Sequence, residues 1–334
     1  MISRRAFLRA AAGGVLAPLA TEAQPAGKVW RIVSIVDVMP SNPVGQGPLF
    51  DRLRELGWVH GQNILYERLA YGAHIERIPD LAAEAMRSGV DIFIVTGSIV
   101  SRRLQQVTRT IPIVTSMAGD LVQGGLADSL GRPGGNVTGV QTLLTEMSSK
   151  NLALLKEIIP TLSRSGVLIG ELGVTEAELR SITFGPMLRE AETSGKTLGI
   201  RLQIVGVHHL EDFAAAFAAF RRERVQGLLA LRSVFMFTHR KIIADLALKH
   251  RIPAISDIPG FVTDGGLVSY GFDLGEAARL LAETIDQILR GAKASEVPIR
   301  QVTTFRLSIN LKTAKALGLT IPPSLLQRAD QVIE

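Results

Sequence analysis

Two parts of this chain repeat each other, and this internal repeat restricts the possible folds more than any other sequence feature. IPIVTSMAGDLVQGG, from Ile111, returns in altered form as IPAISDIPGFVTDGG, from Ile252. VDIFIVTGSIV, from Val90, returns as VQGLLALRSVF, from Val225. In both copies an apolar run leads to a small polar residue, a helical segment follows, and the IP run comes next. A repeat of one supersecondary order predicts two similar lobes.

Short apolar runs alternate with helical segments along most of the sequence. VDIFIVTG is a nearly continuous apolar run, which is typical of a parallel strand buried on both faces. Several helical segments end in glycine, as helix C-termini often do. This alternation predicts an α/β fold with parallel sheets joined by crossover helices. A chain of 334 residues is long enough for two lobes of about 150 residues each.

Residues 1–23 are expected to be an export signal peptide and no part of the fold. They contain the basic residues Arg4 and Arg5, an apolar run from Ala10 to Ala20, and small residues suited to a signal peptidase. The run is too short to cross a bilayer, which takes ~20 residues in a helix. The paired arginines suit the twin-arginine route, and the general secretory route fits equally.

The chain contains no cysteine. This excludes disulfides, cysteine nucleophiles, thiolate metal sites and a lipid anchor attached to a thiol. We therefore expect the mature protein to be periplasmic, soluble and not lipid-anchored.

Composition and motifs argue against a nucleic-acid-binding protein and against an enzyme. The net charge is +6 and aromatic residues make up 5%, without the basic stripe and interleaved aromatics that nucleic-acid binding favours. GxSxG, a phosphate loop ending in GK[ST], GxGxxG and HExxH are all absent, and the six histidines are dispersed. We expect no catalytic residues, no metal, no cofactor and no nucleic-acid partner.

Small polar residues follow several predicted strands, where open parallel sheets bind ligands. They are Thr96, Ser98, Asp120, Ser233 and Asp257. Together with helix N-terminal amides, such groups can hold a carboxylate or another anionic group. Ser98 and Ser233 are equally suited to capping the helices that begin there.

Arg232 is a full charge placed directly after the apolar run GLLAL. Its guanidinium could clamp an acidic ligand through two parallel hydrogen bonds. A salt bridge at the rim of the site is the other interpretation, and the sequence leaves both open.

Seven segments, in order, carry a family resemblance: RELGWVHGQNI, IPIVTSMAGDLVQGGL, GGNVTGV, LLKEIIP, HRIPAIS, GGLVSYG and INLKTAKALGLTIPPSLLQRADQVIE. They resemble the substrate-binding proteins of ABC transporters, including the tryptophan/tyrosine-type members. The resemblance implies a type I periplasmic binding protein fold, with two Rossmann-like lobes joined by a hinge and a ligand cleft between them. The N-terminal lobe would comprise residues 28–143 plus about 273–298, and the C-terminal lobe about 144–272 plus 299–334.

The resemblance also implies a function. A monomeric receptor would capture a small ligand, an amino acid or other carboxylate, and deliver it to an ABC transporter permease, its only link to the membrane. Ser41 and the Thr96-Gly97-Ser98 turn would contribute from the first lobe, and Tyr270 completes the candidate ligand-binding residues. A periplasmic sensing subunit for a membrane signalling protein would have the same sequence features, so that alternative stays open.

Three positions depart from the family pattern. The loop at Asp120 reads GDLV where the family has GDPV. VLIGELG stands where amino-acid-binding members carry an asparagine after the strand, and Ser233 beside Arg232 stands where many members have an acidic residue. The sequence therefore does not identify the ligand.

Overall fold

The computed structural model describes residues 28–37, 39, 42–72, 74–142, 145–170 and 184–334. The expected signal peptide, residues 1–23, and the candidate ligand-binding residue Ser41 lie outside the described residues. Within the described ranges, no helix combines the length and the apolar character needed to cross a membrane.

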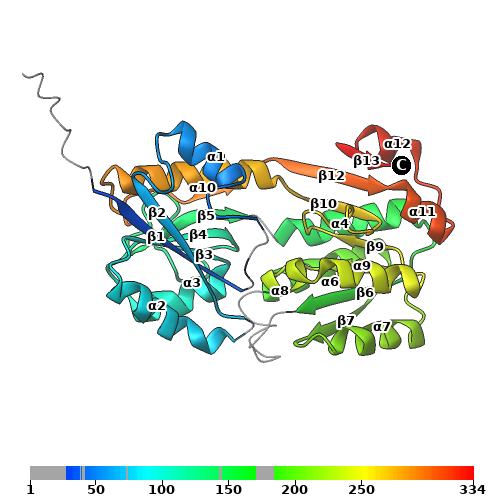
Figure 1. Ribbon diagram of the computed structural model, residues 1–334. Coiled ribbons are helices and arrows are strands. Elements are labelled where there is room, and N and C mark those ends of the chain that lie inside the picture. The colour runs from blue at the N-terminus through cyan, green and yellow to red at the C-terminus, as the bar shows by residue number, and fades with distance from the viewer. Residues whose placement is uncertain (1–27, 38, 40–41, 73, 143–144, 171–183) are drawn as a thin grey trace, which may run out of the picture.

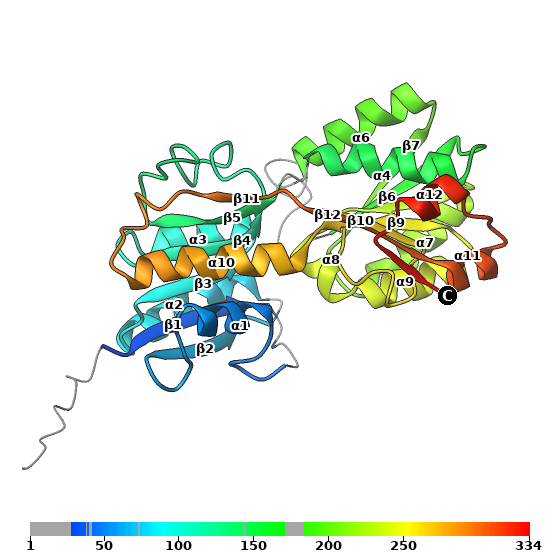
Figure 2. The same ribbon diagram turned by 90° about the horizontal axis from the view of Figure 1, so that it is seen from above.

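The first lobe is built on a sheet of six described strands in the order β11-β5-β4-β3-β1-β2 (Figures 1 and 2). All neighbouring strands in it run parallel. The strands are β1 (Trp30–Val36), β2 (Ile64–Ala70), β3 (Ile92–Thr96), β4 (Ile113–Ala118), β5 (Val137–Thr142) and β11 (Arg300–Val302).

The second lobe contains a sheet of seven described strands in the order β13-β12-β10-β9-β8-β6-β7. It is parallel except where β12 pairs antiparallel with β10. The strands are β6 (Arg164–Gly170), β7 (Arg201–Val207), β8 (Gly227–Ala230), β9 (Ala254–Ser256), β10 (Val268–Phe272), β12 (Phe305–Asn310) and β13 (Gln331–Ile333).

Helices cover both faces of each sheet, so each lobe has three layers with a core on either side of its sheet (Figure 2). In the first lobe α1 (Pro48–Glu55) and α10 (Leu274–Leu289) cover one face. The other face carries η1 (Ile75–Arg77), α2 (Ile78–Arg87) and α3 (Ser98–Val107).

In the second lobe, one face is covered by α4 (Thr145–Ile158), α6 (Gly185–Leu198), α11 (Leu311–Leu317) and α12 (Pro323–Gln327). The other is covered by α7 (Asp212–Arg222), α8 (Val234–Thr238) and α9 (Arg240–Lys249). Phe213, Phe217 and Phe220 recur at helical spacing on α7 and are fully buried. They form the core face of an amphipathic helix, as their spacing predicts.

The sequence repeat corresponds to equivalent parts of the two sheets. β3 and β4 are parallel neighbours in the first sheet, with Val95 opposite Thr115. β8 and β9 are parallel neighbours in the second, with Leu229 opposite Ile255. The prediction of an α/β fold with two parallel-sheet lobes is confirmed.

The order of the described elements requires three crossings between the lobes. The first crossing follows β5, the second joins β10 to α10, and the third joins β11 to β12. The predicted assignment of residues 299–334 to the second lobe is wrong at its start, because β11 pairs with β5 of the first sheet, with Val302 opposite Thr142. The third crossing therefore lies between Val302 and Phe305. A three-residue edge strand is too short to produce a recognisable pattern.

Candidate functional site

The carboxyl ends of strands from both sheets meet beside the crossings, in a region that we call the interlobe site (Figure 1). A Cβ on Gly97, which follows β3, would lie 3.9 Å from the Cγ2 atom of Val234, which follows β8. Thr142, the last residue of β5, accepts a hydrogen bond at 3.2 Å from Arg232, which also follows β8. The sequence repeat thus places equivalent strand ends opposite each other.

On the first lobe, the site is formed by the start of α3. Gly97 is the N-cap residue and has φ 83°, a left-handed conformation that favours glycine. Ser98 is the first helical residue, so the interpretation of Ser98 as the helix cap is wrong. Gly97 has no side chain with which to cap α3, and helix N-terminal amides without such a cap can donate hydrogen bonds to an anion. Thr96 lies beside this turn, with its hydroxyl 3.1 Å from that of Ser116.

Asp120 stabilises the loop that follows β4. Its Oδ1 atom accepts hydrogen bonds of 2.9 Å from the amides of Val122 and Gln123. The side chain is exposed, and these bonds account for one oxygen of its carboxylate. The structure therefore gives Asp120 a turn-forming role.

The end of β4 has an unusual backbone that the sequence interpretation missed. Met117 has φ 50°, and the pairing of β4 with β5 shifts between Thr115 and Ala118. Backbone conformations of this kind are costly and often occur at functional sites. Gly139 on the facing strand was the available signal, because glycine inside a strand often marks a bulge or a close backbone approach.

On the second lobe, Ser233 caps α8. Its Oγ accepts a 3.0 Å hydrogen bond from the amide of Met236 and donates one to the carbonyl oxygen of Gly170. Of the two roles that the sequence left open for Ser233, the structure shows capping.

Arg232 forms a buried ion pair and is not at the rim. Its Nε donates to Asp257 Oδ2 at 3.2 Å, and the two side chains are 5% and 3% exposed. The guanidinium carbon also lies 4.2 Å from the ring centroid of Phe272. Burial lowers the pKa of Arg232, and the charge of Asp257 opposes this shift. The interpretation of Arg232 as part of a salt bridge at the rim of the site is therefore wrong, because the ion pair is buried.

Arg232 belongs to the second lobe and contacts two residues that lie next to crossings between the lobes. Its partner Thr142 precedes the first crossing, and Phe272 precedes the second. Thr142 in turn donates to the carbonyl oxygen of Ala118 at the end of β4. A chain of contacts therefore runs from strand ends of the first sheet to strand ends of the second. Sequence reasoning missed Thr142 and Phe272, because nothing local distinguishes them.

One carboxylate oxygen of Asp257 makes no hydrogen bond in the described part of the chain. The residue is 2% exposed, and its Oδ1 atom is buried without a hydrogen-bond partner. Because buried polar groups normally have partners, such an atom requires an explanation.

Tyr270 lies on β10 and packs against the core of the second lobe. Its ring centroid is 6.1 Å from that of Phe305, and its carbonyl oxygen accepts a 3.2 Å bond from Asn151. These contacts give Tyr270 a packing role between elements of the second lobe.

The carboxylate of Asp37, on the first lobe, interacts electrostatically with the imidazole of His239, on the second lobe. Asp37 directly follows β1 and is buried, whereas His239 separates α8 from α9. Burial lowers the pKa of His239, and the carboxylate of Asp37 opposes that shift. Sequence reasoning missed both residues, although the strand-end rule that selected Asp257 would also have selected Asp37.

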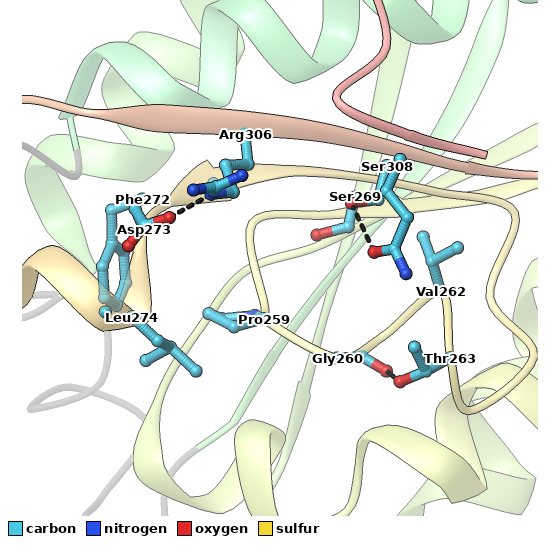
Figure 3. A pocket seen from close by; sticks show the side chains of 13 residues that line it. Pro259, Gly260, Val262, Thr263, Ser269, Phe272, Asp273, Leu274, Arg306 and Ser308 are labelled. Carbon is cyan, nitrogen blue, oxygen red and sulfur yellow. Dashed lines mark hydrogen bonds and ion pairs between the residues drawn. The ribbon is translucent and has the colours of Figure 1, made fainter. Parts of the chain in front are cut away.

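A separate pocket of about 230 Å³ lies where the second lobe meets the second and third crossings (Figure 3). An ion pair between Arg306 and Asp273 lies beside it. Asp273 caps α10 by accepting from the amide of Glu276 at 2.7 Å, and Glu276 accepts from the amide of Thr304 at 2.7 Å. These contacts tie the second and third crossings together. Among the described residues, no group of three or more histidines or carboxylates could hold a metal ion.

Comparison with known proteins adds independent findings. A family model described as ABC transporter substrate binding protein matches residues 35–333. The tyrosine-binding protein of Clostridioides difficile (strain R20291) is 22% identical over 268 residues, which are 80% of this chain and 74% of that protein.

Two solved structures have the same two-lobed fold. A conserved domain protein of Vibrio cholerae O1 biovar El Tor has a TM-score of 0.81 and 24% identity, covering 91% of this chain and 100% of that one. An ABC domain of Streptococcus pneumoniae in complex with L-Trp has a TM-score of 0.80 and 21% identity, covering 92% and 100%.

Proposed function

The chain belongs to the family of ABC transporter substrate-binding proteins and has the type I periplasmic binding protein fold, and on that premise we propose that it delivers a small solute to an ABC transporter permease. The solute would be captured between the lobes, in the periplasm, by a monomer. The observation that carries the proposal is the meeting of strand ends from both sheets at the interlobe site, where open α/β sheets bind ligands.

The chemistry of the interlobe site supports a ligand with a carboxylate. The N-cap residue of α3, Gly97, makes no side-chain capping bond, and the dipole of this ten-residue helix favours a negative group at its start. A relative named for tyrosine binding and a similar structure holding L-Trp support an amino acid within this class. We expect the ligand to be bound and released unchanged.

Lobe closure provides the physical link between binding and transport. A ligand that contacts both lobes favours the closed arrangement by the difference between its affinities for the closed and open forms. The three crossings allow such rotation, because a hinge is formed by a few residues that absorb backbone changes. The permease would then recognise the closed form.

The test uses the mature chain, from residue 24, purified gently from the periplasm. Mass spectrometry should find a bound small carboxylate, and its removal and re-addition should be followed by calorimetry and small-angle scattering. Re-addition should reduce the radius of gyration of a monomer and stabilise it by ~2.7 kcal/mol at 100 times the dissociation constant. Conversion of the ligand into a product, or an unchanged radius, would contradict the receptor function.

Location and transport need separate measurements. N-terminal sequencing should find Gln24 as the first residue of a periplasmic, soluble form. Uptake of the labelled ligand by cells should require both this chain and its permease. Uptake that persists without the chain, with loss of a signalling response instead, would favour the sensing alternative.

A further inference from the structure

We propose that the end of the second lobe remote from the interlobe site binds the anionic phospholipid headgroups of a membrane surface. The inference adds a second link to the membrane besides the permease, and it relies on the proposed function only for a location next to that membrane. We call this end of the lobe the basic end. It consists of seven exposed cations, which are Arg164, Arg201, Arg221, Arg222, Arg224, Lys249 and Arg251.

The cations of the basic end gather at the amino ends of four neighbouring strands. In the second sheet β9, β8, β6 and β7 lie side by side and run parallel. Their carboxyl ends face the interlobe site, so their amino ends lie at the side of the second lobe away from the first lobe (Figure 1). Arg164 and Arg201 are opposite each other at the first positions of β6 and β7. The other five cations end α7 and α9 or follow them, in the segments that lead into β8 and β9.

The ends of α7 and α9 bring their charges close together. The ring of His250, which follows α9, lies 5.7 Å from the ring of Phe217 on α7. Burial lowers the pKa of His250, and the charges of Lys249 and Arg221 lower it further. Cations from both helices therefore act on one imidazole. Since neighbouring strands are about 5 Å apart, the basic end is about 15 Å wide.

The charges of the basic end are mostly uncompensated. In the described part of the chain, its single ion pair joins Arg222 to Glu223 at 3.8 Å, and both side chains are exposed. The amino end of the first sheet is different. There Lys28 pairs with Asp91. Arg31 pairs with Glu67.

Two arginines of the basic end occupy a backbone conformation that favours glycine. Arg224 and Arg251 follow the C-cap residues of α7 and α9, and both have φ 55°. A residue with a side chain adopts this left-handed conformation at an energetic cost. The equivalent residues after α1 and α2 are Gly57 and Gly89, with φ 92° and 82°. Glycine would therefore suit the fold better at both positions, and a costly conformation of this kind points to a function of the side chain.

Helix dipoles explain only part of this arrangement. Cations stabilise the C-terminal end of a helix, which accounts for Arg221, Arg222 and Lys249. This effect does not account for Arg164 and Arg201, because each begins a strand. It also does not explain why the two positions with positive φ carry arginine.

The composition of the basic end favours a surface that carries many phosphate groups. Six of its seven cations are arginines, and a guanidinium binds phosphate through two parallel hydrogen bonds. The segments RRERVQ and KHRIP contain no aromatic residue of the kind that anchors a protein interface or stacks on bases. Clusters of exposed lysine and arginine bind anionic lipid surfaces. Because the interlobe site lies at the opposite ends of the same strands, membrane binding would leave it open.

The variant Arg224→Gly/Arg251→Gly tests the inference without endangering the fold. Glycine adopts a positive φ without a steric cost, so this variant should unfold at a higher urea concentration than wild type. The matched control is Arg87→Gln/Arg109→Gln. Arg87 ends α2 and Arg109 follows α3, so the control removes two exposed charges from the corresponding end of the first lobe.

The mature chain, from residue 24, is mixed with vesicles of phosphatidylcholine, either alone or with about one third phosphatidylglycerol, and binding is measured by cosedimentation. Wild type should bind only the anionic vesicles and should be released by salt. The glycine variant should bind about tenfold or more weakly, because each cation at such a surface contributes a factor of about five. The control should change binding by less than about twofold, because its charges lie far beyond the screening length of about 8 Å.

Three results would overturn the inference: equal binding of anionic vesicles by wild type and the glycine variant, equal binding of neutral and anionic vesicles, or no binding of anionic vesicles at low salt. Binding that requires the permease in the vesicles, or that occurs only with a nucleic acid or an acidic protein, would also overturn it. None of these results bears on solute capture. If no small molecule were found in the chain while anionic vesicles still bound it, the proposed function would fail and this inference would stand.

Discussion

Replacing Arg232 by methionine would remove the cation from a buried ion pair. The side chains of Arg232 and Asp257 are 5% and 3% exposed, so Asp257 would be left buried without its cationic partner. Removing one partner of a buried pair costs about 3–5 kcal/mol, because the other charge is left uncompensated. We expect Arg232→Met to lower the free energy of unfolding of the second lobe by this amount.

The double variant Arg232→Met/Asp257→Asn separates the charge effect from lost packing. Because it contains no buried charge, it should recover about 2 kcal/mol relative to Arg232→Met, which is within the range of coupling measured between contacting residues. Lys241→Met is the matched control, since the Lys241–Asp245 pair is 66% and 60% exposed. It should change stability by no more than about 0.5 kcal/mol.

Urea unfolding should be followed by two probes, because the lobes can unfold separately. Both tryptophans of the chain, Trp30 and Trp58, belong to the first lobe, so their fluorescence reports on that lobe. Far-ultraviolet circular dichroism reports on both lobes and should show the shifted transition. A loss below about 1 kcal/mol in Arg232→Met, or a double variant no more stable than the single one, would refute the reasoning.

Three further outcomes are expected. Gly139→Ala should destabilise the first lobe by about 3 kcal/mol or more, because the new Cβ would lie 2.1 Å from the carbonyl oxygen of Thr115. The control is Gly131→Ala, whose new Cβ would have no atom within 4 Å and which should leave the urea midpoint nearly unchanged. Burial opposes ionisation of Glu276, but hydrogen bonds from the third crossing outweigh it and lower its pKa. The contribution of Glu276 to stability should be present above its unfolded pKa of about 4.3 and be lost as pH falls through its folded pKa. The urea midpoints of wild type and Glu276→Gln should therefore converge in acid. A difference that stays constant with pH would contradict this. Phe217→Ala should cost about 3–5 kcal/mol in calorimetric unfolding, since Phe217 is fully buried, and a loss below about 1 kcal/mol would show that α7 is not a core element.

Structural features that depend on residues close together in the sequence could be predicted well. The phenylalanines of α7 are the clearest case, because spacing alone places Phe213, Phe217 and Phe220 on one helical face. The end of β8 is a second case, since a serine after an apolar run is suited to capping the next helix, as Ser233 does. At β3 the same rule selected Ser98 instead of Gly97, because glycine carries no side chain whose capping bond could be anticipated.

The candidate site could be predicted only in part. The strand-end rule selected Thr96 and Asp257, and a charge directly after an apolar run selected Arg232; all three lie at strand ends. It gave no indication that Arg232 would pair with Asp257, 25 positions away, and with Thr142, 90 positions away. Such contacts depend on which strands are neighbours and on the angle between two lobes, and neither quantity has a local signature.

By itself, the sequence determined the class of the fold, the two lobes and the strand ends at which a site could form. Hydrophobic periodicity and internal repetition carry this information, because burial of apolar faces is the dominant favourable term in folding. Only the tertiary structure decided that β11, from Arg300 to Val302, belongs to the first sheet. It also decided that a charge pair beside the crossings is buried with one carboxylate oxygen unpaired. These outcomes depend on long-range packing, since a charge far from its partner in the sequence finds it only when the sheets have formed.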